Sequence, residues 1–181
     1  MMLSLVKMVH LLALGLWAGA MVFFSFFTAL PIIGEWPARL TQAGHWMGIQ
    51  DAKQGTRAAG EVLDLLFQRY FPFQLVVGLV AVATALWLAT LPGWLAKARA
   101  LVLVMALALT AANWFYLAPA VHQARAERYG ADAQVAAAAE ASFGSLHTRS
   151  LLADMAALLL VLIALGSAAW LPAPLPPPGS P

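Results

Sequence analysis

The stretch from Phe73 to Pro92 reads FQLVVGLVAVATALWLATLP and contains no ionisable side chain. A helix of this length covers about 30 Å, the thickness of the hydrocarbon core of a bilayer. Three comparable apolar stretches accompany it, so the predicted spans are approximately residues 3–30, 71–91, 99–118 and 149–171. The sequence therefore predicts an all-α integral membrane protein, a four-transmembrane-helix bundle with helical extensions on one side.

The composition agrees with this class. Of 181 residues, 62% are hydrophobic and 10% are charged, and the mean hydropathy is +0.80. Soluble domains typically contain fewer hydrophobic and more charged residues. We expect a single four-span domain at residues 1–171 in contact with the lipid bilayer, and a disordered proline-rich tail at 172–181. A net charge of +2 without a basic run argues against a nucleic-acid partner. The absence of cysteine excludes disulfides and thiolate metal centres.

Four spans place the two longer connections, about 31–70 and 119–148, on the same side of the membrane. All eight acids and seven of the ten Lys and Arg belong to that side or to span ends facing it. The Lys/Arg bias favours a cytoplasmic location for these connections.

The longer connections are predicted to be partly helical. We expect an amphipathic helix at 61–67 lying at the membrane interface, and Pro72 in the first turn of the second span. The pattern also predicts a helical extension at 120–129, with Asp132 as the N-cap of the helix that follows. Gly144 and Ser145 are expected to break that helix before the last span.

Polar side chains occur at a similar depth in every predicted span. An ionised carboxylate facing lipid costs several kcal/mol, so we expect Asp154 to face the bundle interior. His147, Ser150 and Asp154 are spaced three and four residues apart and therefore share a helix face. Such a face can bind a polar solute or a cation, or relay a proton. The candidate ligand site comprises Asn113, His147, Ser150, Asp154, Gln74 and Glu61, and Ser25 and Thr28 lie at the matching level of the first span.

A structural interpretation of these residues stays open beside the functional one. The same groups can satisfy one another and hold the helices together through interhelical hydrogen bonds of about 0.6 kcal/mol each. Phosphate-binding glycine loops, zinc-protease helices and serine nucleophile elbows are missing from the sequence, which therefore does not favour an enzyme.

The first span carries two further signals. Lys7 and His10 share a face near the end opposite to the polar level, and a neutral imidazole there can coordinate haem or copper. The alternative is that Lys7 reaches the head groups and His10 bonds a carbonyl group. Gly15 and Gly19 form a small-xxx-small motif, which suits close packing within the bundle, a homo-oligomer, or a membrane protein partner.

Several segments together are similar to a known family. They are 9–12 with 15–21 and 30–31, then 59–62 with 66–71, then 113–119, and finally 143–150. In this order they resemble the domain-of-unknown-function 4149 (DUF4149) family, also called transmembrane protein 205-like. The resemblance implies a four-helix membrane domain without a settled activity, and we expect it in a bacterial cytoplasmic membrane. The family's positions map to His10, Trp17, Gly19, Glu61, Phe67, Tyr70, Asn113, Pro119, His147 and Ser150.

Two qualifications accompany this resemblance. Asp154 stands where the family pattern leads us to expect asparagine, so a charged role for it is particular to this chain. The first span alone more distantly resembles the copper-resistance CopD domain and the protoporphyrinogen oxidase HemJ. That second likeness is the reason to consider haem or copper at His10.

Overall fold

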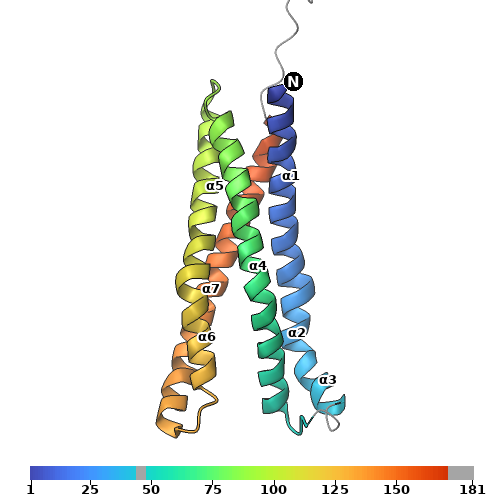
Figure 1. Ribbon diagram of the computed structural model, residues 1–181, viewed down its shortest axis with the longest axis vertical. Helices are drawn as coiled ribbons and strands as arrows, with labels where there is room; N and C mark the ends of the chain where they lie inside the picture. The colour runs from blue at the N-terminus through green and yellow to red at the C-terminus, as the bar shows by residue number, and fades with distance from the viewer. Residues whose placement is uncertain (44–47, 171–181) are drawn as a thin grey trace, which may run out of the picture. The chain divides into compact units, whose positions relative to one another are not determined.

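The computed structural model describes residues 1–43 and 48–170, so the predicted tail at 172–181 lies outside the described residues. Within the described part the secondary structure is helical, without strands, and four continuous helical segments are long and apolar enough to cross a membrane (Figure 1). These segments are Met2–Gly34, Ala52–Leu88, Trp94–Glu127 and Ala133–Gly166. The predicted class, an all-α protein with four membrane-spanning helices, is confirmed.

The four segments divide into shorter elements. The first comprises α1 (Met2–Val22), η1 (Phe23–Ala29) and α2 (Leu30–Gly34), and α3 (Trp36–Ala43) follows it. The second is α4 (Ala52–Leu88) alone. The third comprises α5 (Trp94–Ala112), η3 (Asn113–Leu117) and α6 (Ala118–Glu127), and the fourth is α7 (Ala133–Gly166) with the short 3-10 helix η4 (Ser167–Trp170).

The elements η1 and η3 are π-helical, and each is followed closely by a proline, Pro31 or Pro119. A proline inside an α-helix lacks its own N–H and collides with the carbonyl group four residues before it. A π turn widens the helix and moves the preceding hydrogen bonds to a longer spacing. The residue before each proline donates accordingly to a carbonyl five residues back: Leu30 to Ser25, and Ala118 to Asn113.

Helix α4 differs from its prediction in two respects. It begins directly after Asp51, whose carboxylate accepts a hydrogen bond from the Gln54 N–H at 2.8 Å, and it continues unbroken to Leu88. Pro72 therefore lies in the middle of a 37-residue helix, and not in the first turn of a span. The predicted separate interfacial helix at 61–67 is also wrong, because these residues continue the spanning helix.

Helix α7 confirms one expectation and corrects another. Asp132 is its N-cap, and its carboxylate accepts hydrogen bonds from the backbone N–H groups of Gln134 at 2.8 Å and Val135 at 3.2 Å. The predicted break at Gly144 and Ser145 is wrong, because α7 is helical throughout its 34 residues. One glycine costs a helix only about 1 kcal/mol, and the alanine-rich stretch before it is strongly helix-forming.

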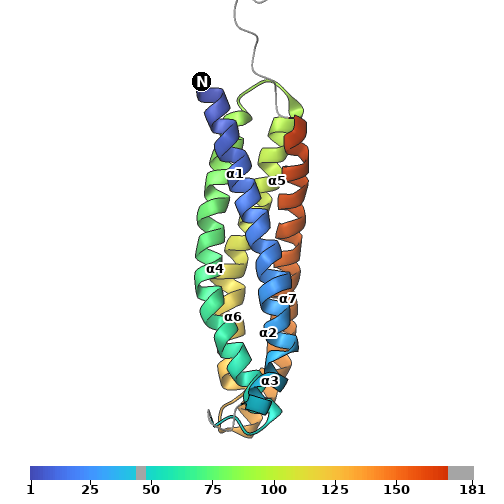
Figure 2. The same ribbon diagram turned by 90° about the vertical axis from the view of Figure 1, so that its right-hand side faces the viewer.

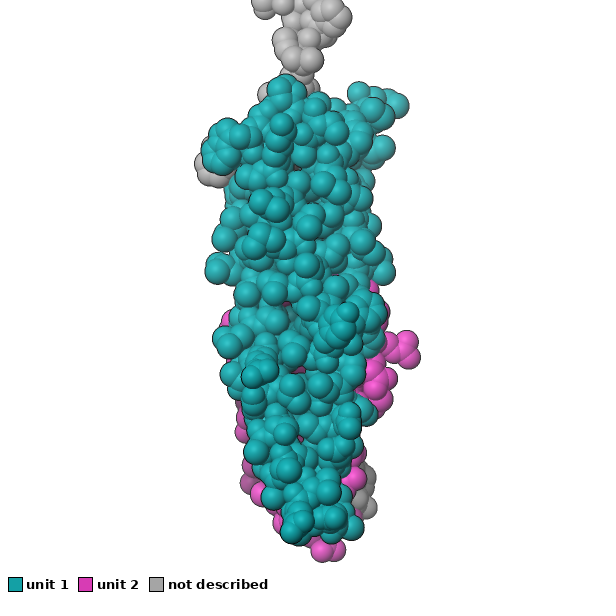
Figure 3. Space-filling view, turned by 90° about the vertical axis from the view of Figure 1, so that its left-hand side faces the viewer, with its two compact units in different colours: residues 1–18, 75–181 teal, residues 19–74 magenta. Residues whose placement is uncertain are grey.

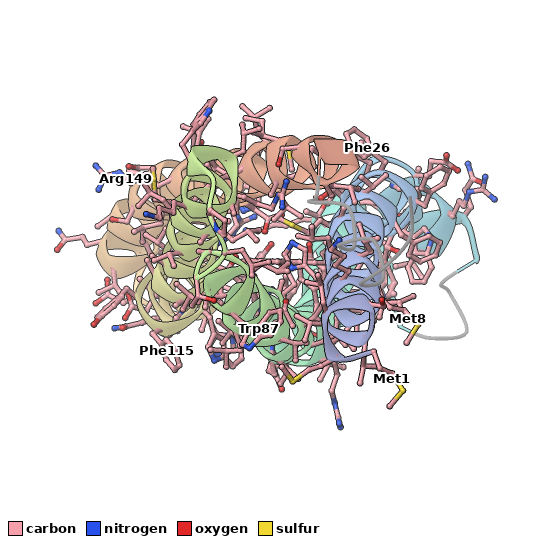
Figure 4. The ribbon with its side chains drawn as sticks, turned by 90° about the horizontal axis from the view of Figure 1, so that it is seen from above. Met1, Met8, Phe26, Trp87, Phe115 and Arg149 are labelled. Carbon is pink, nitrogen blue, oxygen red and sulfur yellow. The ribbon has the colours of Figure 1, made fainter. Side chains whose placement is uncertain are left out.

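By their internal contacts the residues form two compact units, coloured separately in Figure 3. The first unit contains residues 1–18 and 75–181, and it therefore includes parts of all four long helices. Within it α5 and α6 pack along α7, as Figures 1 and 2 show from two directions. Figure 4 shows Met8 and Phe115 pointing away from these helices, as side chains that face lipid do.

Small residues bring the helices of the first unit close together. A Cβ atom added to Gly78 of α4 would lie 2.9 Å from the Trp17 ring of α1 and 3.0 Å from Leu107 of α5. Trp17 itself is fully buried. Alanines fill much of the remaining core, since small side chains let helix backbones approach in a membrane. The buried alanines of this unit include Ala81, Ala85, Ala96, Ala100, Ala106, Ala157 and Ala164.

The second unit contains residues 19–74. An aromatic cluster joins η1 to the first half of α4, where the Phe24 and Tyr70 rings stack with centroids 4.0 Å apart and Phe67 lies 5.0 Å from Phe24. At the other end of this half of α4, a Cβ atom added to Gly55 would lie 2.6 Å from the carbonyl oxygen of Pro37. Glycine at this position therefore permits α3 to pack directly on α4.

Candidate functional site

The polar level of the first unit is built on a hydrogen-bonded pair between the third and fourth long helices. The Ser150 hydroxyl of α7 donates to the side-chain oxygen of Asn113 at 2.7 Å. The Asn113 amide in turn donates to the backbone oxygen of Ser150 at 3.1 Å. Asn113 is 1% exposed, so both bonds are shielded from competing solvent. The two residues that sequence reasoning placed at one depth are in contact.

Asn113 stands where the α-helix α5 passes into the π turn η3. It is the first residue of η3, and its own N–H is shared between the carbonyl groups of Leu109 and Thr110. A π turn inserts one extra residue into the helix and so rotates the side chains that follow relative to a regular α-helix. Sequence reasoning missed this feature, although the sequence carries a signal for it: a polar residue followed by two aromatic residues stands six positions before a proline, both at Ser25 and at Asn113.

Asp154 and His147 extend the site along α7. Asp154 is half-buried and its Oδ1 atom is inaccessible to solvent. It lies on the same face of α7 as the buried Ala157 and Val161, one and two turns before them. His147 is also half-buried, and its ring stacks on Phe143 with centroids 5.6 Å apart. The three predicted residues of α7 therefore occupy the face that joins the buried stripe.

The other two predicted residues belong to the second unit. Gln74 is fully buried. Glu61 has a largely exposed side chain and forms an ion pair with Arg57, one turn earlier in α4, at 3.0 Å. Exposed pairs of this kind contribute at most about 1 kcal/mol. The surroundings of Glu61 are those of a solvated helix surface, in contrast to the shielded carboxylate of Asp154.

His10 lies in the core of the first unit and is fully buried. Its Nδ1 atom is 2.9 Å from the Thr84 hydroxyl of α4, and the ring also bonds the backbone of Ala81, the kind of partner that the sequence suggested as an alternative. Its Nε2 atom is buried without a hydrogen-bond partner among the described residues. Within the same residues no group of three His, Cys, Asp or Glu side chains comes together as a metal site. Among the described residues, a haem or a copper ion at this position would therefore have one side-chain ligand, the Nε2 atom of His10.

Gly15 and Gly19 lie on an exposed face of α1. A Cβ atom added at either glycine would meet no atom within 4 Å. The motif therefore does not serve close packing among the described helices. Its use in association with a second copy or another membrane protein stays a prediction.

The comparisons with known proteins give one result. The family described as a domain of unknown function (DUF4149) matches residues 12–130. This range covers the first long helix from residue 12 onward, the second and third long helices and the Asn113 turn, and it ends before α7. No curated protein and no solved structure is significantly similar to the chain.

Proposed function

Because the chain belongs to the DUF4149 family, for which no activity is assigned, we propose from its geometry that it binds a proton or a small cation at Asp154. The site comprises Asp154 and His147 on α7, together with the Asn113–Ser150 pair that fixes α5 and η3 against α7. The observation that carries the proposal is a carboxylate with one solvent-inaccessible oxygen inside an apolar membrane helix.

The electrostatic argument concerns the charge of this carboxylate. Leu151 and Leu152 precede Asp154, and a run of apolar residues follows it from Met155 to Leu165. An ionised aspartate costs about 2.5–3.5 kcal/mol at the centre of a membrane helix by membrane-insertion scales, and Asp154, which stands nearer the end of the apolar run, bears part of this cost. A bound proton removes the charge, and a bound cation compensates it. The carboxylate is therefore a site at which proton or cation occupancy changes the free energy of the membrane-embedded protein.

The neighbouring groups suit either occupant. Carboxylate and backbone carbonyl oxygens are the ligands that hard cations prefer. For a proton, His147 lies two helical turns from Asp154 toward the turn at 128–132, and an imidazole can take up and release a proton. Since His147 is half-buried, it is suited to connect the solvent with the shielded carboxylate.

The test uses Asp154→Asn with Glu127→Gln as the matched control, because Glu127 is an exposed carboxylate on α6 of the same unit. Infrared difference spectra of purified protein are recorded against pH and against added Na⁺ or K⁺. We expect a protonated carboxyl band in the wild type that disappears as the pH rises or as one cation is added. The band should be missing in Asp154→Asn and unchanged in Glu127→Gln.

Proteoliposomes separate binding from movement across the membrane. Decay of an imposed proton, Na⁺ or K⁺ gradient that is faster with wild type than with Asp154→Asn would extend the proposal from binding to transport. Identical infrared titrations of wild type and Asp154→Asn, with both proteins folded by circular dichroism, would contradict it.

A further inference from the structure

A second charged group lies inside the first unit, away from the site described above. Arg99 of α5 is only 4% exposed. It shares the buried face of this helix with Ala96, Ala100, Leu103, Ala106 and Thr110. Its Nε atom donates to the Ser167 hydroxyl at 2.9 Å, and its Nη2 atom donates to the Ser167 carbonyl group at the end of α7. The guanidinium thus points into the helices and does not extend to the surface, as most membrane arginines near a helix end do.

The described structure gives Arg99 no anionic partner. Arg99 takes part in none of the ion pairs described, which include Arg39–Glu35, Arg57–Glu61 and Arg128–Glu140. The sequence explains why, since all eight acids fall within residues 35–64 and 127–154. The segments that surround Arg99 in the first unit, 1–18, 75–112 and 157–170, contain no acid.

His10 supplies a second, independent observation. It is fully buried, it stands in the first half of α1, which begins at the end of the first unit where α5 begins and α7 ends (Figure 1), and its Nε2 atom has no hydrogen-bond partner among the described residues. The Thr84 hydroxyl holds the opposite ring nitrogen, Nδ1, at 2.9 Å. The same hydroxyl lies 2.8 Å from the Val80 carbonyl oxygen and 2.9 Å from that of Ala81. The ring orientation is therefore fixed, and Nε2 remains available to a ligand.

The partners of Arg99 offset only part of the cost of its burial. An arginine within the apolar part of a membrane helix costs about 2.5–3.5 kcal/mol or more. The carbonyl end of a helix stabilises a neighbouring cation by about 0.3–1 kcal/mol, or up to about 2 kcal/mol when the geometry is partly buried. Ser167 engages two N–H groups of the guanidinium, which leaves its remaining donors for another oxygen.

We propose that Arg99 and His10 form a binding site for a phosphate group in the part of the first unit where α5 begins and α7 ends. Arginine binds phosphate oxygens through paired N–H donors, and the Nε2 lone pair of His10 would accept a hydrogen bond from a protonated phosphate oxygen. The phosphate belongs either to a lipid head group or to a dissolved anion. The site uses residues distinct from the Asp154 site, so each proposal can fail without the other.

The test measures binding to the full-length protein in an uncharged detergent. Inorganic phosphate represents the dissolved anion, and dihexanoyl phosphatidic acid represents the lipid head group. We expect one of these probes to raise the melting temperature of the wild type and to be retained at one molecule per protein in native mass spectrometry. Arg99→Gln should weaken this binding at least about tenfold, because it removes the charge and the paired donors.

Lys97→Gln is the matched control, since Lys97 lies two residues before Arg99 on α5 but is exposed. Its affinity for the probe should stay within about twofold of the wild type, as expected for an exposed charge. Arg99→Lys keeps the charge without the planar fork, and it should bind with intermediate affinity. If Arg99→Gln does not fold, the binding of the probe to Arg99→Lys is compared with that to the wild type instead.

Three results would overturn the proposal. The first is a wild type that neither probe stabilises, which would leave Arg99 as the C-terminal cap of α7 alone. The second is equal binding by the wild type and a folded Arg99 variant. The third is a Soret band or stoichiometric copper in the purified wild type that is lost in His10→Ala, since Nε2 would then be a metal ligand.

Discussion

At the scale of single residues, Asn113 and Ser150 satisfy each other's hydrogen-bonding groups. The two hydrogen bonds, at 2.7 and 3.1 Å, agree with the structural interpretation that the sequence left open for these two residues. They also hold the backbone of α7 against η3 one turn from Asp154. A positioning role for the pair is therefore compatible with ligand binding at the carboxylate.

Ser150→Ala should destabilise the protein. The substitution removes the donor to Asn113 and leaves a buried amide oxygen with one partner fewer, at a cost of about 1 kcal/mol. Ser142→Ala on the same helix is the control, because the Ser142 hydroxyl is exposed and bonds only the Ala138 carbonyl group within its own helix. Thermal unfolding followed by circular dichroism should show a lower midpoint for Ser150→Ala alone. Equal midpoints for the two variants would mean that the Asn113–Ser150 pair contributes no stability.

At the scale of the helices, two glycines on spanning helices predict opposite responses to the same substitution. Gly78→Ala places a methyl group 2.9 Å from the fully buried Trp17 ring, so the ring or the helices must shift, at a cost of about 1–3 kcal/mol. Gly15→Ala meets no atom within 4 Å and should be neutral or stabilising by up to about 1 kcal/mol, because alanine favours the helix. Thermal melting of both variants in one detergent tests this difference. A destabilised Gly15→Ala would show that its face is packed after all.

The sequence predicts helices well where the signals are local. Asp132 was recognisable as an N-cap because the motif depends on residues within one turn. The unbroken course of α4 through Pro72 and of α7 through Gly144 was not predicted, because packing along the whole helix outweighs one unfavourable residue. The two π turns were readable in principle, since the same spacing of polar, aromatic and proline residues occurs at 25–31 and at 113–119.

The arrangement of the polar side chains could likewise be predicted only in part. The common face of His147, Ser150 and Asp154 follows from helical periodicity, so it could be read from spacing alone. The inward orientation of Arg99 could not, because the sequence does not state which side of α5 meets the other helices. A basic residue near a span end is ordinarily assigned to the membrane surface, and here the fold turns it into the core.

At the scale of the whole molecule, the chain contains no cysteine, so single introduced thiols can report its topology. Pro92 and Ala131 are exposed and lie at opposite ends of the spanning segment Trp94–Glu127. Pro92→Cys and Ala131→Cys should therefore react with a membrane-impermeant maleimide from opposite sides of intact cells or inverted vesicles. The Lys/Arg bias predicts that residue 131 is cytoplasmic. Labelling of both thiols from one side would contradict a membrane-spanning course for this segment.

The length of α7 has a mechanical consequence. Its 34 residues extend about 51 Å, roughly 20 Å more than the hydrocarbon core of a bilayer. Because the helix has no break, it behaves as a stiff rod whose projecting end and membrane-embedded carboxylate move together. A partner that binds the projecting part of α7 and displaces it would therefore also displace Asp154, without any rearrangement of intervening loops.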